Sequence, residues 1–158
     1  MRQIPALHYI SQGKDAEEHL KNIEMACSHG APLVQLRMKG FEEEEVLKTG
    51  IRAKEICQKY GSLLIINDYY RLVPEIKADG AHVGKQDASP TILRNYLGDS
   101  FLIGGTANSL DDCRNLIAQG VDYIGLGPYR YTTTKENLSP ILGLQGYRDI
   151  MSALGNQT

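Results

Sequence analysis

Apolar and polar residues alternate along the chain with two different periods, which predict strands and helices in regular succession. Short apolar runs of the kind found in buried strands occupy 7–11, 33–39, 63–68, 80–84, 101–107 and 123–128. Residues at helical spacing follow each of them, at 15–30, 42–61, 70–78, 89–98, 109–120 and 144–154. Serine begins two of these segments and glycine ends four of them, as is typical of helix ends.

Six βα units without a hairpin signal predict an α/β fold with a parallel sheet and helices outside it. The segments 30–37, 77–84 and 120–127 also share a pattern, in which a turn leads into a strand that ends at a polar residue or glycine. This repetition favours the TIM (β/α)8-barrel family over an open two-sided sheet. For 158 residues we expect one partial βα-barrel domain spanning 1–158, with about six of the eight units.

Composition and charge narrow the class of protein. The chain is 42% hydrophobic and 23% charged, which is typical of a folded globular domain. Its net charge of −2 gives no overall attraction to nucleic acid or membrane, and we expect neither as a partner. No apolar run approaches the roughly 20 residues of a membrane span, and the N-terminus lacks the apolar core of a signal peptide. Cys27, Cys57 and Cys113 lack metal-ligand spacing and predict buried free thiols in a reducing cytoplasm.

Polar residues gather where the predicted strands end, and in parallel α/β proteins these ends meet at one rim. In strand order they are Gln35, Arg37 and Lys39; Asn67 and Asp68; Lys85, Gln86 and Asp87; Thr106 and Asn108; and Thr132, Thr133, Thr134 and Lys135. Cations alone would indicate an anion site. Cations beside two carboxylates predict a diphosphate bridged to Mg²⁺, which takes one or two carboxylates and completes its shell with phosphate oxygens.

Each of these residues also has an ordinary structural interpretation. Arg37 and Lys39 can be surface charge, and Asp68 and Asp87 can cap the helices that follow them. His82, inside a strand, can be a hydrogen-bonded core histidine, and the threonine loop can be inert. Their coincidence at one rim is what favours a phosphate site.

Five segments carry a resemblance to a known family. They read VQLRMK, IINDYYRL, ADGAHVGKQD, IGGTANS and DYIGLGPYRYTTTKENLSPILG, in that order along the chain. In residues and spacing they are similar to bacterial thiamine phosphate synthases, also called thiamine phosphate pyrophosphorylases. The resemblance implies a cytoplasmic transferase that joins 4-amino-2-methyl-5-hydroxymethylpyrimidine diphosphate to 4-methyl-5-(2-phosphoethyl)-thiazole. Pyrophosphate would leave in a dissociative substitution assisted by Mg²⁺.

The resemblance implies a role for each matched residue. The substrate-binding residues would be Gln35, Arg37, Lys39, Asn67, Thr106, Thr132, Thr133, Thr134 and Lys135, and the magnesium ligands Asp68 and Asp87. Arg37, Lys39 and Lys135 would be the catalytic groups, because positive charge stabilises the departing pyrophosphate. The partners implied are two small-molecule substrates, and a homo-oligomer stays open.

Two features depart from the family pattern. Arg71 stands where the family has a further acid after the Asn-Asp pair. The family continues beyond the point equivalent to Thr158 with two more strands, so we expect the chain to lack part of the thiazole phosphate site. Two alternatives remain open: a relative of the thiazole tautomerases, whose catalytic histidine falls at Asn108, and a truncated barrel that binds phosphate without turnover.

Overall fold

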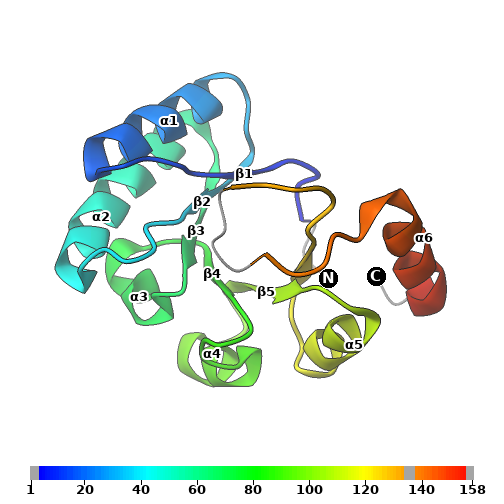
Figure 1. Ribbon diagram of the computed structural model, residues 1–158. Coiled ribbons are helices and arrows are strands. Elements are labelled where there is room, and N and C mark those ends of the chain that lie inside the picture. Colours follow the sequence, from blue (N-terminus) through cyan, green and yellow to red (C-terminus); the bar gives the residue numbers. More distant parts are fainter. Residues whose placement is uncertain (1–3, 134–137, 156–158) are drawn as a thin grey trace.

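A computed structural model, which describes residues 4–133 and 138–155, contains one sheet of six parallel strands (Figure 1). The strands are β1 (His8–Ile10), β2 (Leu33–Leu36), β3 (Leu63–Asn67), β4 (Gly80–Val83), β5 (Leu102–Ala107) and β6 (Tyr123–Leu126). Each pairs with the next along the chain, and in the described residues β1 and β6 are the edges. This sequential order distinguishes the sheet from a doubly wound one, in which the strand order reverses.

The helices lie around the outside of the sheet (Figure 1). They are α1 (Ala16–Ser28), α2 (Glu43–Tyr60), the 3₁₀ helix η1 (Tyr70–Leu72), α3 (Val73–Ile76), α4 (Pro90–Leu97), α5 (Leu110–Ala118) and α6 (Gly143–Leu154). The predicted α/β succession is confirmed, with ends displaced by a few residues. The predicted helix 70–78 is divided into η1 and α3, and Pro74 lies in the first turn of α3, where its missing N–H leaves no bond unmade.

The two faces of the sheet bury different side chains, because successive residues of a strand point to opposite sides. Val34, Leu36, Leu64 and other outward residues form the main core under the helices. On the inner face, Leu33, Ile65 and Leu102 form a smaller apolar cluster. The continuous apolar pattern of these strands thus reflects burial on both faces.

The register of the strands decides what lies above the inner cluster. Gln35 is paired with Ile65, and Asn67 with His82, so these side chains share the inner face. In β2, β3 and β5 the inward-facing residues therefore start with an apolar side chain and become polar toward the carboxyl end of the strand. The sheet consequently places polar groups on an apolar floor.

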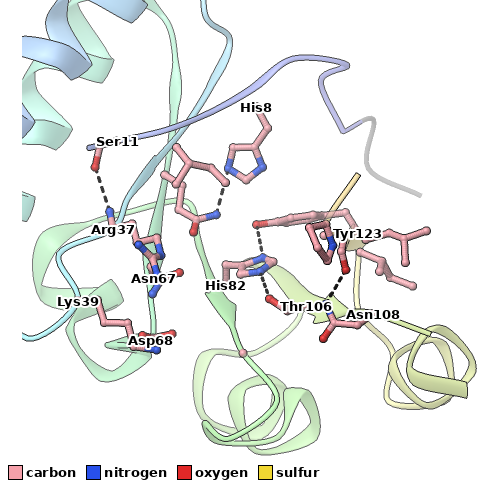
Figure 2. A pocket seen from close by; sticks show the side chains of 18 of the residues that line it. His8, Ser11, Arg37, Lys39, Asn67, Asp68, His82, Thr106, Asn108 and Tyr123 are labelled. Atoms are coloured by element: carbon pink, nitrogen blue, oxygen red, sulfur yellow. Dashed lines mark hydrogen bonds between the residues drawn. The ribbon is translucent and has the colours of Figure 1, made fainter. Parts of the chain in front are cut away.

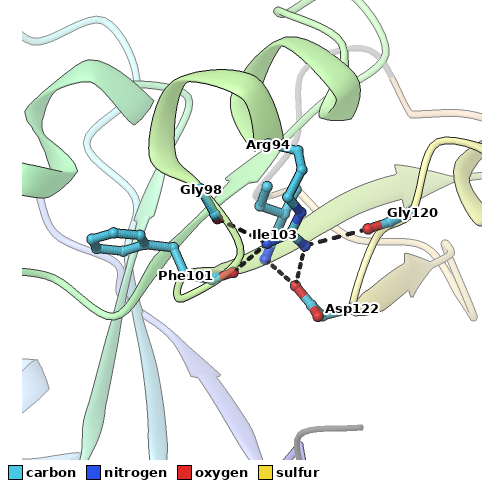
Figure 3. Close-up of polar contacts among 6 residues, drawn as sticks. All are labelled: Arg94, Gly98, Phe101, Ile103, Gly120 and Asp122. Carbon is cyan, nitrogen blue, oxygen red and sulfur yellow. Dashed lines mark hydrogen bonds and ion pairs between the residues drawn. The ribbon is translucent and has the colours of Figure 1, made fainter.

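A group of polar contacts connects strand β6 to the βα unit before it (Figure 3). Asp122, just before β6, accepts hydrogen bonds from the Ile103 backbone N–H (2.8 Å) and from Arg94 Nη2 (2.7 Å). Arg94 also donates to the backbone carbonyls of Gly98, Phe101 and Gly120. One guanidinium thus connects α4, β5 and the turn before β6.

The same contact recurs before β4, where Asp79 accepts from the Leu64 backbone N–H (2.7 Å) and from Lys54 Nζ (2.6 Å). In both units an aspartate one residue before a strand binds the second residue of the preceding strand and a cation of a preceding helix. This shared contact accounts for the sequence similarity between 77–84 and 120–127.

The cysteines bear out a further expectation. Cys27, Cys57 and Cys113 lie in α1, α2 and α5 as buried, unpaired thiols. None of the helices in the described part of the chain combines the length and apolar character needed to cross a bilayer.

Replacing Asp122 by alanine should lower the free energy of unfolding by about 1–3 kcal/mol, because it leaves the Ile103 N–H without its acceptor and the Arg94 guanidinium without its counter-ion. Urea denaturation followed by circular dichroism measures this change. Asp99→Ala, at an exposed turn position, is the matched control. Equal stability of the two variants would contradict the structural role of Asp122.

Candidate active site

A cavity of about 670 Å³ lies on the inner face of the sheet, above the apolar cluster and toward the strand ends (Figure 2). Side chains from every strand unit line it, from His8 on β1 to Thr132 after β6. Its two sides differ in chemistry. Charged residues gather on the side of β2, β3 and the β4 loop, and neutral aromatic and hydroxyl groups gather toward β5 and β6.

The charged side brings together the cations and carboxylates that the sequence predicted at the rim. Arg37 and Lys39 extend from the end of β2, beside Asp68 at the end of β3 (Figure 2). Asp87, from the loop after β4, lines the same cavity. Gln35 and Asn67 precede Arg37 and Asp68 on β2 and β3 and are buried, at 2% and 7% exposure.

Asp68 and Asp87 form a pair of carboxylates whose like charges repel each other. Burial raises the pKa of Asp68 to about 6, and a hydrogen bond and the negative charge of Asp87 act in the same direction. Lys39 and Arg37 act in the opposite direction and lower it. Asp68 also has a left-handed backbone (φ 63°), which costs a non-glycine residue roughly 1–2 kcal/mol. Strain and an unfavourable charge pair at one position are typical of a functional site.

The capping interpretation of these two aspartates does not hold. The side chain of Ser89 caps α4, and η1 begins after Tyr69 without a side-chain cap. Asp87 instead accepts the Gly84 backbone N–H through Oδ2 (2.8 Å), which turns its carboxylate back toward the end of β4. Both carboxylates are therefore available at the cavity.

The described residues contain no group of three or more His, Cys, Asp or Glu side chains arranged to hold a metal. Asp68 and Asp87 supply two carboxylates, which is the number that Mg²⁺ commonly takes when water and phosphate oxygens complete its shell. Burial is the main cause of the raised pKa of Asp68, and a bound divalent cation would relieve the repulsion from Asp87 that adds to it. The donor set thus fits magnesium.

The neutral side of the cavity is built around His82. Its ring is stacked on Tyr123 and hydrogen-bonded to the Tyr123 hydroxyl (3.2 Å) and to Thr106 Oγ1 (3.0 Å). The Tyr123 ring crosses directly over Gly104, where an added Cβ would lie 2.1 Å from the ring. Glycine at that position is therefore what admits the tyrosine.

His8 completes this wall from the edge strand β1. It makes an edge-to-face contact with Tyr123 and lies 3.4 Å from the Gln35 amide nitrogen. Burial lowers the pKa of His8 to about 4 and raises the pKa of Tyr123, so both are neutral near pH 7. An uncharged, hydrogen-bonding wall suits an uncharged heteroaromatic ring.

Most residues that the sequence placed at the site line this cavity, although their roles stay predictions. They are Gln35, Arg37, Lys39, Asn67, Asp68, Asp87, Thr106 and Thr132. Thr133 is exposed and is not a lining residue in the described chain. Thr134 and Lys135 lie outside the described residues. His8 and Tyr123 were not predicted, because they lie before the ends of their strands. Strand pairing nevertheless turns both inward: His8 lies two residues before the partner of Gln35, and Tyr123 pairs with Gly104.

Comparisons with known sequences point to one family. A family model described as thiamine monophosphate synthase matches residues 7–156. Thiamine-phosphate synthase from Phocaeicola vulgatus is 44% identical over 145 residues, which cover 92% of this chain and 70% of that protein. The synthase from Flavobacterium johnsoniae is 43% identical over 148 residues, which cover 94% and 70%.

Solved structures show the same fold. The chain superimposes on a thiamine phosphate pyrophosphorylase from Pyrococcus furiosus with a TM-score of 0.81 at 21% identity, covering 94% of this chain and 71% of that one. The enzyme of that name from Bacteroides thetaiotaomicron gives a TM-score of 0.64 at 15% identity, covering 93% and 66%.

Replacing Asp87 by asparagine should lower the pKa of Asp68 from about 6 toward its ordinary range, because the neighbouring negative charge disappears while the burial remains. Carbon-detected NMR titration of the Asp68 carboxyl measures the shift. Asp99→Asn removes a distant charge and should leave that pKa in place. An Asp68 pKa unaffected by Asp87→Asn would refute the carboxylate pair.

Gly84→Ala should displace the Asp87 carboxylate and leave the fold intact. A Cβ at Gly84 would lie 2.8 Å from Asp87 Oδ2, which is the mobile end of a side chain. We expect the thermal midpoint to change little and Mg²⁺ binding, followed by calorimetry, to weaken severalfold. Binding equal to that of the unaltered protein would show that Asp87 does not depend on this approach.

Proposed function

The chain belongs to the thiamine monophosphate synthase family, and we propose that it joins an aminopyrimidine methyl diphosphate to a thiazole phosphate, releasing pyrophosphate. In this reaction the bond from the pyrimidine methylene to the diphosphate oxygen breaks, and a bond from the methylene to the thiazole nitrogen forms. The substrates are small molecules, and the product is thiamine phosphate. One observation supports the assignment above all: cations and a carboxylate pair share a cavity with a neutral aromatic wall.

The charged side of the cavity would bind the diphosphate. Arg37 and Lys39 bring positive charge to the rim, and in a partly buried site charge-assisted hydrogen bonds to phosphate are stronger than in water. Their charge becomes more effective as negative charge grows on the leaving pyrophosphate, which is the condition for accelerating the reaction. Lys135, by family resemblance, would add a third cation.

Asp68 and Asp87 would hold Mg²⁺. When bound, Mg²⁺ supplies a Lewis acid that neutralises charge on the diphosphate oxygens. The carboxyls themselves must be ionised to bind it, so protonation of Asp68 near its pKa of about 6 would compete with the metal.

The neutral side would bind the pyrimidine ring. Tyr123, His82 and His8 offer stacking and hydrogen bonds without charge, and the buried Gln35 amide can bind a ring nitrogen or an amino group. A dissociative substitution needs no protein nucleophile, and the three cysteines are buried in helices away from the cavity. Thr132 lines the β6 side, where the thiazole phosphate would lie.

The sheet fits the TIM-barrel family at the level of the whole fold. Parallel strands in sequential order, helices outside and a cavity at the carboxyl ends support this assignment. The relatives are longer, since the chain covers about 70% of their length.

The tautomerase alternative receives less support from the site. Asn108 stands where that group would need its histidine, and its amide donates to the Gly127 carbonyl (2.6 Å) as a loop contact. A reaction without a diphosphate substrate would also not need the carboxylate pair as magnesium ligands. A phosphate-binding barrel without turnover is separated from the synthase by assay alone.

The assay supplies both substrates with and without Mg²⁺ and measures thiamine phosphate. We expect turnover that a chelator abolishes, and a decrease of about a hundredfold or more in Asp87→Asn, because a metal ligand is lost. Asp99→Asn is the control for expression and folding. Pyrophosphate binding without turnover would indicate the inactive barrel, and full activity of Asp87→Asn would contradict the metal role.

A further inference from the structure

One predicted rim cation, Lys85, does not line the anion cavity. Its Nζ lies 2.5 Å from Asp112 Oδ2, with side chains 45% and 23% exposed. Lys85 and Asp112 instead line a second space of about 350 Å³ between α4 and α5. The charge of Lys85 is therefore directed toward α5 and away from the diphosphate side of the site.

Lys85 belongs to a tight turn that also carries a proposed metal ligand. The turn runs from Gly84 to Asp87, and the Asp87 backbone N–H donates to the Gly84 carbonyl (3.3 Å). The Gly84 N–H in turn donates to the Asp87 carboxylate (2.8 Å). Because both bonds close the same four-residue turn, a restraint on Lys85 also restrains the position of Asp87.

Asp112 connects this turn to the end of β5. The same oxygen that binds Lys85 accepts the Asn108 backbone N–H (2.9 Å), and the Asp112 backbone N–H donates to Ser109 Oγ (3.1 Å). Asp112 is thus fixed in the first turn of α5 from two directions. Its carboxylate therefore contacts both the turn after β4 and the segment after β5.

Asn108 extends the connection to the loop after β6. Its side-chain amide donates to the Gly127 carbonyl (2.6 Å), just before the segment that carries Thr132. A continuous series of polar contacts therefore runs from the Asp87 turn, through α5, to the loop that borders the far side of the cavity.

We propose that Asp112 is a positioning residue, which holds the Asp87 turn through Lys85 and the β6 loop through Asn108, so that the two substrate sites keep a fixed separation. The proposal rests on the proposed function. If Asp112 acted only as a helix cap, asparagine would serve equally well, since its carbonyl oxygen still accepts the Asn108 N–H and its backbone N–H is unchanged. Asp112→Asn therefore isolates the charge attraction between Asp112 and Lys85.

The neighbouring residue provides a matched control. Asp111 lies on the same helical turn, its side chain is 90% exposed, and its nearest cation is 3.8 Å away. Asp111→Asn and Asp112→Asn change the net charge equally. Urea denaturation of both variants establishes that each is folded.

The activity arm measures the Mg²⁺ concentration that gives half-maximal turnover. Asp112→Asn should raise it about three- to fivefold, the effect of a partly exposed ion pair, while kcat at saturating Mg²⁺ changes little. Asp111→Asn should match the unaltered enzyme. Lys85→Met should reproduce the effect, and adding it to Asp112→Asn should cause no further change, because both remove the same ion pair.

A second arm does not depend on turnover. Amide hydrogen exchange of the Gly84 N–H, which is bonded to Asp87, should be severalfold faster in Asp112→Asn than in Asp111→Asn. If exchange and Mg²⁺ activation are the same in both variants, the positioning role is overturned even though the enzyme is active. If the unaltered protein shows no turnover, the proposed function fails, and the exchange measurement still decides whether Asp112 restrains the turn.

Discussion

Parallel pairing in fixed register is the constraint on which the rest of this structure depends. It places alternate residues of every strand on the inner face, so Leu33, Ile65 and Leu102 form an apolar floor. Toward the carboxyl ends the same rows become polar and form the walls of the cavity. A slip of one residue in any strand would exchange inner and outer side chains and remove its contribution to the site.

The site itself is less favourable energetically than the sheet that holds it. The carboxyl groups of Asp68 and Asp87 are close enough to repel each other, and Asp68 adopts a left-handed backbone conformation. Arg37 and Lys39 offset part of the charge repulsion. The contacts of Asp79 and Asp122 stabilise the strands from the opposite, amino-terminal side, so stability and chemistry are located at different ends of the sheet.

Three lysines of this fold have different surroundings. Lys39 reaches the cavity, Lys54 binds Asp79, and Lys85 binds Asp112. The secondary-structure element that faces each lysine determines whether its charge is paired or reaches the cavity. A count of rim cations therefore overestimates the charge available to a diphosphate, and the family resemblance leaves this distinction open.

The sequence alone determined the succession of strands and helices, because hydrophobic period and helix capping are local properties. It also located the charged residues of the cavity, since polar residues at the ends of parallel strands must meet at one rim. The wall of His8, His82 and Tyr123 and the partner of Lys85 came from the tertiary structure. These contacts join residues far apart in the chain, and they depend on strand register and packing distance, which no local pattern encodes.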